Sequence, residues 1–247
     1  MSVLRYSDPV TAAQACGQRI MDLLSEALAA RHRATLAVSG GSSPRPMFEL
    51  FGKSSFLWTR VHIFWVDERY VPPWDPQSNF RLANDTWLTR AKVPPGNIHR
   101  VPTEREPHEA AHQYAEEIRA LFQGSFGLKA GEQPRFDVIH RGIGSDGHTA
   151  SLFPGEALID DHERLAAAVW VDKMSQWRVT LLPGVLEAAR NTVMLATGAD
   201  KADALEAVLN GPYDPMKWPA QIATRDPSGA PASGTMWFLD QAQAASP

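Results

Sequence analysis

The stretch TLAVSGGSSP at residues 35–44 joins an apolar run to a loop of glycine and serine. Residues 35–39 have the short, continuous apolar character of a central strand in a parallel sheet. Pro44 is favoured in the first turn of a helix, so the loop before it is predicted to connect a strand to a helix. A strand, a tight loop and a helix in succession form the first part of a βαβ unit.

The same alternation continues on both sides of this stretch. Further apolar runs predict strands at 61–66, 136–139, 169–171, 192–196 and 236–239. Helical spacing of apolar residues predicts helices over 20–28, 111–122 and 201–209. Thr103 and Glu106 are spaced as a capping box for the second helix. The fold class is therefore predicted as α/β: three layers, with a mainly parallel sheet covered by helices on both faces, in a single domain over 1–247.

Composition narrows the classes of function. The 247 residues carry 24 Lys and Arg against 28 Asp and Glu, and the net charge of -4 argues against a nucleic-acid surface. The only cysteine, Cys16, excludes an intramolecular disulfide and a multi-cysteine metal site. No apolar run is long enough to cross a bilayer, and the first ten residues lack a signal-peptide core. We expect a cytoplasmic protein with no membrane partner.

The glycine-serine loop is a candidate phosphate site. Gly40 and Gly41 permit close approach of a ligand to the backbone, while Ser42 and Ser43 add hydroxyl donors at a helix N-terminus. The loop matches neither a P-loop nor a dinucleotide fingerprint. A plain tight turn with a capped helix explains the same residues equally well.

A second loop, GIGSDGHTAS at 142–151, carries a candidate base. Its three glycines indicate a tightly folded loop whose backbone closely approaches another group. Asp146 and His148 lie two residues apart within this loop. A histidine near a carboxylate suits general-base catalysis near neutral pH. The spacing leaves open whether Asp146 pairs with the imidazole or orients the loop. One His with one Asp is poor evidence for a metal, and no metal is expected.

Three further charged segments follow predicted strands. Asp67, Glu68 and Arg69 come directly after the strand at 61–66, Arg178 begins the run RVTLL, and Lys201 starts a helix. Ligands bind at the carboxyl ends of strands in open parallel sheets. A lysine in a first helical turn opposes the helix dipole, which an anionic ligand would relieve. Taken singly, each is better explained as a solvated charge.

In this order the motifs resemble the 6-phosphogluconolactonase family. The resemblance rests on SGGSSP, FWVDERYVP, SNFRL, GIGSDGHTASLFPG, RVTL and GADKADAL, between residues 39 and 205. It implies a Rossmann-like fold of the sugar-phosphate isomerase and deaminase type. It also implies hydrolysis of 6-phospho-D-glucono-1,5-lactone, a step of the oxidative pentose phosphate pathway, without a cofactor. The related glucosamine-6-phosphate deaminases carry a Glu where this chain has Phe153, and DEY where it has Asp67, Glu68 and Arg69.

The site expected from this resemblance has two ends. His148 would act as general base, with Asp146 beside it. Arg69 would stabilise the charge on the oxyanion or hold a hydroxyl of the sugar. Asp67 would position Arg69 or the sugar. The phosphate would lie on Gly40, Gly41, Ser42 and Ser43, enclosed by Arg178 and Lys201. Backbone N–H groups at 40–41 or 142–144 are candidates for the oxyanion hole. The alternatives are a deaminase-type enzyme and a sugar-phosphate-binding module without turnover. A small-molecule ligand and a monomer or weak homodimer are expected.

The chain departs from the family pattern at a few positions. His140 and Arg141 stand where relatives usually have apolar residues, Ser145 replaces a frequent Glu, and Leu182 replaces a frequent Thr. Burying two polar side chains without partners would be costly. Either His140 and Arg141 face the cleft, or their strand ends early. Leu182 brings the phosphate pocket near Arg178 into question.

Overall fold

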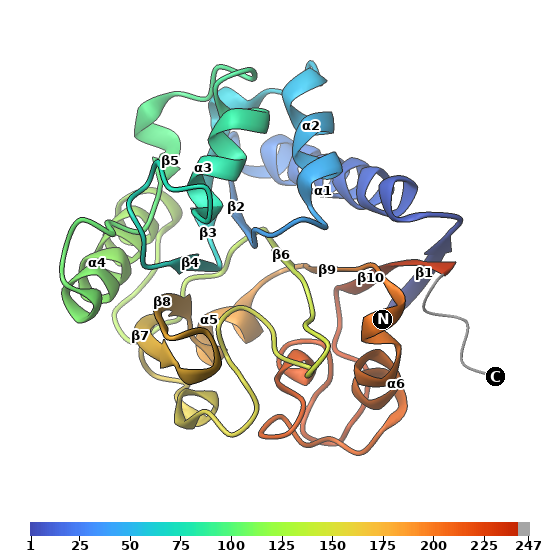
Figure 1. Cartoon of the computed structure of the whole chain (residues 1–247). Helices are drawn as coiled ribbons and strands as arrows, with labels where there is room; N and C mark the ends of the chain where they lie inside the picture. Colours follow the sequence, from blue (N-terminus) through green and yellow to red (C-terminus); the bar gives the residue numbers. More distant parts are fainter. Residues whose placement is uncertain (242–247) are drawn as a thin grey trace.

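A seven-stranded parallel sheet forms the centre of the molecule in the computed structural model, which describes residues 1–241. The order is β1 (Ser2–Tyr6), β10 (Thr235–Asp240), β9 (Thr192–Ala196), β6 (Val138–Arg141), β2 (Ala34–Val38), β3 (Val61–Trp65) and β5 (Ile98–His99). Every neighbouring pair in it is parallel. Figure 1 shows it running across the molecule from β5 to β1. The predicted α/β class and mainly parallel sheet are confirmed.

A second, antiparallel sheet lies beside the first. It contains β4 (Asp67–Arg69), β8 (Gln176–Leu181) and β7 (Ala166–Val171). The prediction that 169–171 is a strand holds, but its placement in the parallel sheet is wrong. Trp170 is 44% exposed while its neighbours in β7 are buried, which is the alternation of an antiparallel strand with one solvated face.

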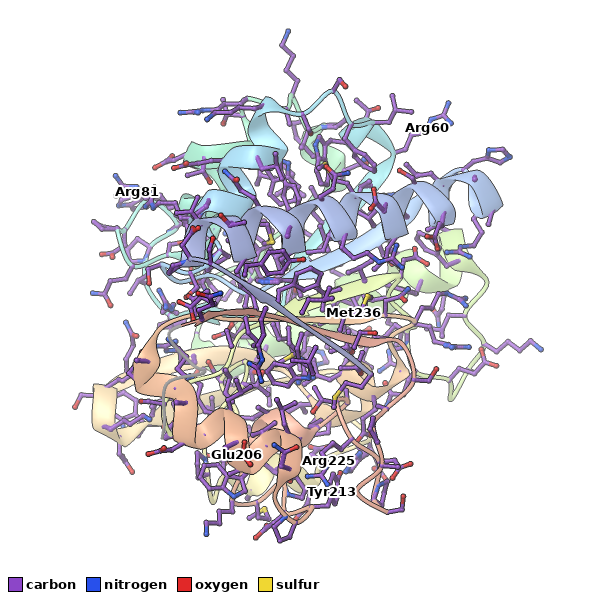
Figure 2. The ribbon with its side chains drawn as sticks, turned by 90° about the vertical axis from the view of Figure 1, so that its right-hand side faces the viewer. Arg60, Arg81, Glu206, Tyr213, Arg225 and Met236 are labelled. Atoms are coloured by element: carbon purple, nitrogen blue, oxygen red, sulfur yellow. The ribbon has the colours of Figure 1, made fainter. Side chains whose placement is uncertain are left out.

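Helices cover both faces of the central sheet. The helices are α1 (Pro9–Arg31), α2 (Arg45–Lys53), α3 (Asn79–Ala83), α4 (Pro107–Phe126), α5 (Pro183–Ala188) and α6 (Ala202–Asn210). One core packs α1 and α2 against Leu36, Val38 and Val193, and another packs α4 against Phe64 and Ile139. A third core lies under α6, and Figure 2 shows α1 and α6 on opposite sides of the sheet. The three-layer arrangement follows from strands that are buried on both faces.

Two helix beginnings differ from expectation. The predicted helix at 20–28 is part of the longer α1, which Asp8 caps by accepting a hydrogen bond from the Thr11 N–H at 2.9 Å. The predicted capping box is wrong, because Glu106 itself is the N-cap of α4 and accepts from the N–H groups of His108 and Glu109. No helix within residues 1–241 is long and apolar enough to span a bilayer.

Candidate functional site

A cavity of about 260 Å³ opens where β2, β3, β6 and β9 end. Nine of the ten predicted site residues line it, although they come from loops far apart in the sequence. They are Gly40, Gly41, Ser42, Ser43, Asp67, Arg69, His148, Arg178 and Lys201. The tenth, Asp146, does not line it but is hydrogen-bonded to His148, which does. A parallel sheet brings these loops together because its strands all end at the same edge.

The loop at 39–44 needs both of its glycines. Gly41 has φ of +99°, a conformation that L side chains rarely adopt. A Cβ on Gly40 would lie 2.0 Å from the Asn79 side-chain oxygen, so no side chain fits there. The Thr197 hydroxyl donates to Ser43 Oγ at 2.9 Å and ties the loop to the end of β9. The loop thus lies directly before the N-terminus of α2, the position at which helices bind anions.

His148 is fixed by its own loop. Its Nδ1 lies 2.5 Å from Asp146 Oδ1, and the same oxygen accepts the backbone N–H of His148 at 3.1 Å. Asp146 therefore both pairs with the imidazole and shapes the loop, the two roles that the sequence left open. A carboxylate only accepts hydrogen bonds, so in the neutral form of the ring the proton sits on Nδ1 and Nε2 carries the lone pair. Gly144 permits this geometry, since a Cβ there would lie 2.1 Å from the imidazole.

Asp146 also accepts a hydrogen bond from a lysine outside its own loop. Lys173, in the turn between β7 and β8, donates to Asp146 Oδ2 and lies 4.3 Å from the centroid of the Phe153 ring. Partial burial raises the pKa of Asp146, but the hydrogen bonds from His148 and Lys173 outweigh it and hold that pKa well below its ordinary value. The carboxylate thus stays ionised beside the imidazole. Lys173 was not singled out from the sequence.

Asp67 and Arg178 form a buried pair. The Asp67 carboxylate accepts the Ser151 hydroxyl at 2.8 Å and lies 3.7 Å from Arg178 Nη1. Of the two roles expected for Asp67, the positioning of Arg69 is not seen, since Arg69 donates to the Gln77 carbonyl at 2.7 Å, and a contact with the sugar stays a prediction. β4 pairs with β8 at this point, which places Asp67 opposite Thr180 and Arg69 opposite Arg178. Leu182 does not disturb the pocket, since its side chain lies in the core under α4.

Lys201, directly before α6, also lines the cavity. Its ammonium donates to the Thr197 carbonyl at 2.7 Å and lies 3.6 Å from Asp200 Oδ1. Arg69, Arg178 and Lys201 thus face one cavity whose only acidic lining residue, among residues 1–241, is Asp67. That balance of charge favours an anionic ligand.

Glu68 is a structural residue of the site that sequence reasoning missed. Its carboxylate accepts the N–H groups of Arg69, Asn79 and Phe80 at 2.7–2.8 Å and the Ser78 hydroxyl at 3.2 Å. Burial raises the pKa of Glu68 to about 7, although these backbone hydrogen bonds oppose the rise. The Asn79 amide in turn donates to the Asp67 carbonyl at 2.9 Å and packs against Gly40. Glu68 therefore joins the segment SNFRL to the loops on both sides.

Replacing Glu68 with glutamine is expected to lower the free energy of unfolding by about 3 kcal/mol, because the new NH₂ group would face donors where an oxygen accepted them. Chemical denaturation followed by circular dichroism measures the loss. The matched control is Glu104→Gln, which weakens an exposed pair with Arg100 and should cost less than about 1 kcal/mol. Equal effects of the two substitutions would contradict the structural role of Glu68.

His140 and Arg141 occupy different sides of the sheet. β6 continues through Arg141, so the strand does not end early, and both side chains are buried. His140 lines the cavity, as the first of the two alternatives expected. Arg141 does not line it, and instead donates to the Ile222 carbonyl at 2.6 Å. Alternation along a strand separates the two neighbours.

Several buried polar atoms around the cavity lack a hydrogen-bond partner within residues 1–241. They are Ser39 Oγ, Asn79 Oδ1, Arg69 Nε, Arg178 Nε and both ring nitrogens of His140. Each such atom costs about 1–3 kcal/mol when nothing bonds to it, so the cavity is built for a polar ligand. No group of three His, Cys, Asp or Glu within the described part of the chain is arranged to hold a metal ion.

Comparisons with known proteins identify the family of this chain. The family model described as glucosamine-6-phosphate isomerases/6-phosphogluconolactonase matches residues 7–232. A 6-phosphogluconolactonase of Synechocystis is 36% identical over 88% of this chain and 86% of its own length, and that of Haemophilus influenzae is 34% identical over 85% and 86%. The crystal structure of the Thermotoga maritima 6-phosphogluconolactonase superposes with a TM-score of 0.78 at 26% identity, covering 97% and 99% of the two chains. The chain therefore belongs to the glucosamine-6-phosphate isomerase/6-phosphogluconolactonase family.

Proposed function

We propose that this chain hydrolyses 6-phospho-D-glucono-1,5-lactone to 6-phospho-D-gluconate, the second step of the oxidative pentose phosphate pathway. The relatives at 34–36% identity carry the name of this activity. The observation that carries the proposal is one cavity that holds a carboxylate-paired imidazole together with a glycine-serine loop and three cationic side chains. An imidazole suits proton transfer, and the loop and cations suit a phosphate.

The proposed reaction begins with attack of water on the lactone carbonyl. His148 Nε2 takes a proton from the water as its oxygen bonds to the carbonyl carbon, and Asp146 stabilises the resulting imidazolium. The carbonyl π electrons move to the oxygen, where Arg69 or backbone N–H groups at 40–41 stabilise the charge. The intermediate then expels the ring oxygen, which takes the proton from the imidazolium. The Gly144 N–H is a weaker candidate for the oxyanion because it already donates to the His148 carbonyl.

The deaminase alternative is less well supported by the surroundings of His148. The related deaminases place a Glu carboxylate where this chain has Phe153, whose ring centroid lies 4.3 Å from that of His148. A phenyl ring cannot relay the proton that ring opening of an amino sugar requires. Release of ammonia from glucosamine 6-phosphate at a rate comparable with lactone hydrolysis would favour the deaminase.

The test is the initial rate of lactone opening, followed by acid release in weak buffer after subtraction of spontaneous hydrolysis. We expect acceleration of the phosphorylated lactone and a much higher KM for glucono-1,5-lactone, which lacks the phosphate. A rate equal to the buffer background, with retained binding of 6-phosphogluconate, would support the non-catalytic sugar-phosphate-binding module instead. The single domain over 1–247, the cytoplasmic location and the monomer or weak homodimer stay predictions.

Replacing Lys173 with methionine is expected to raise the pKa of the Asp146 carboxyl by about 0.5 unit. The variant loses a hydrogen bond that helps to hold this pKa below its ordinary value, and half a unit corresponds to about 0.7 kcal/mol, within the range for exposed ion pairs. The lysine is 49% exposed at its side chain, which limits the effect. Carbon-13 NMR of the Asp146 carboxyl at low and high salt provides the check, because a Coulombic effect shrinks with screening. An unmoved Asp146 titration at low salt would exclude this role.

A further inference from the structure

The cavity contains a second imidazole that the proposed reaction does not use. His140 is 1% exposed, lines the cavity, and has no hydrogen-bond partner on either ring nitrogen within residues 1–241. Burial of a polar group is stable when the group is hydrogen-bonded, and here the protein supplies no such bond. The imidazole is therefore available to a ligand.

The register of the sheet places His140 at the phosphate end of the cavity. Its neighbours across the sheet are Val38 in β2 and Val193 in β9. Both belong to the core under α1 and α2, as does Val138, two residues earlier on the same face of β6. The His140 side chain therefore faces the layer of α2, whose N-terminus follows the glycine-serine loop.

The environment keeps this imidazole uncharged. Burial, followed by the positive charge of Arg141, lowers the pKa of His140 to about 3. Near neutral pH the ring therefore has one N–H donor and one acceptor. Arg178 and Lys201 already supply positive charge to the cavity. A neutral ring therefore adds a directional hydrogen bond without further repulsion between cations.

We propose that His140 is a specificity-determining residue whose buried N–H donates a hydrogen bond to an oxygen of the substrate phosphate. This inference rests on the proposed function for the identity of the ligand, but the contact itself depends only on a phosphate bound by the glycine-serine loop. The oxygens of a phosphate dianion are strong acceptors, and a buried donor that lines the cavity distinguishes a phosphorylated ligand from its dephosphorylated counterpart.

Kinetics of His140→Leu test the contact. The expected result is a fall of about tenfold in kcat/KM for the phosphorylated lactone, mainly through KM, with no change for glucono-1,5-lactone. The control Val193→Ala removes a buried neighbour that does not line the cavity, and should lower stability without moving KM. Equal losses on both lactones, or no loss on either, would overturn the proposal.

Nitrogen-15 NMR of the wild-type histidine rings gives a second test that needs neither turnover nor a folded variant. The ring signals of His140 should be those of a neutral tautomer from pH 5 to 8, and should shift on addition of inorganic phosphate and of 6-phosphogluconate. If inorganic phosphate shifts the His140 signals but the protein does not hydrolyse the lactone, the proposed function is refuted and the contact is retained. If the His140 signals do not move when the protein is saturated with 6-phosphogluconate, the proposed contact is overturned.

Discussion

Substitution of His148 by alanine is expected to lower kcat for the phosphorylated lactone by about 10²–10⁴-fold, the usual contribution of a general base. The imidazole lines the cavity and is held by Asp146 through Nδ1, and no other lining side chain within residues 1–241 combines an imidazole with a carboxylate partner. The side chain is 26% exposed, so its removal should leave thermal unfolding almost unchanged. Initial rates, corrected for spontaneous opening, and thermal melts measure the two effects.

The matched control for His148 is His162→Ala. His162 also pairs with a carboxylate, since its Nδ1 lies 2.9 Å from Glu187 Oε2, but it is exposed and outside the cavity. This control should retain wild-type rates. If His148→Ala kept more than about a tenth of the activity, it would not be the base, and His140 could not replace it because its pKa lies near 3.

The fold was predictable where local pattern and tertiary environment agree. The strands at 35–39 and 192–196 match β2 and β9 to within one residue at each end, because a strand buried on both faces shows as a continuous apolar run. β1 was missed because it is an edge strand with the mixed sequence SVLRY and a largely exposed surface. β4 consists of Asp67, Glu68 and Arg69, whose strand pairing depends on β8, about 110 residues away.

The site was predictable to the extent that loops carry local signals. The spacing of glycines, Asp146 and His148 identified one end, and the SGGSSP loop identified the other. Glu68 was missed because a buried carboxylate is rare, and its partners at 78–80 lie ten to twelve residues away on another element. The orientations of His140 and Arg141 depended on how far β6 extends, which the composition of 138–141 does not determine.

Replacing Lys201 or Arg178 with methionine is expected to raise KM for the phosphorylated lactone by about 10–100-fold, with kcat close to wild type. A hydrogen bond to a charged group contributes about 1.5–3 kcal/mol, which corresponds to this range of affinity. Lys201→Met is the cleaner variant, because Arg178→Met would also leave the buried Asp67 beside Ser151 without its cation. Steady-state kinetics on the phosphorylated and unphosphorylated lactones measure the effect.

The two lactones separate phosphate binding from every other role of these cations. Glucono-1,5-lactone carries no dianion, so its kcat/KM should be the same in wild type and in Lys201→Met. Lys217→Met removes an exposed lysine that packs on Trp218 outside the cavity, and should leave KM unchanged for both substrates. A fall in kcat with unchanged KM would place the cations at the reacting carbonyl. Wild-type behaviour of both cavity variants would require a phosphate site elsewhere, and the glycine-serine loop would then be a plain turn.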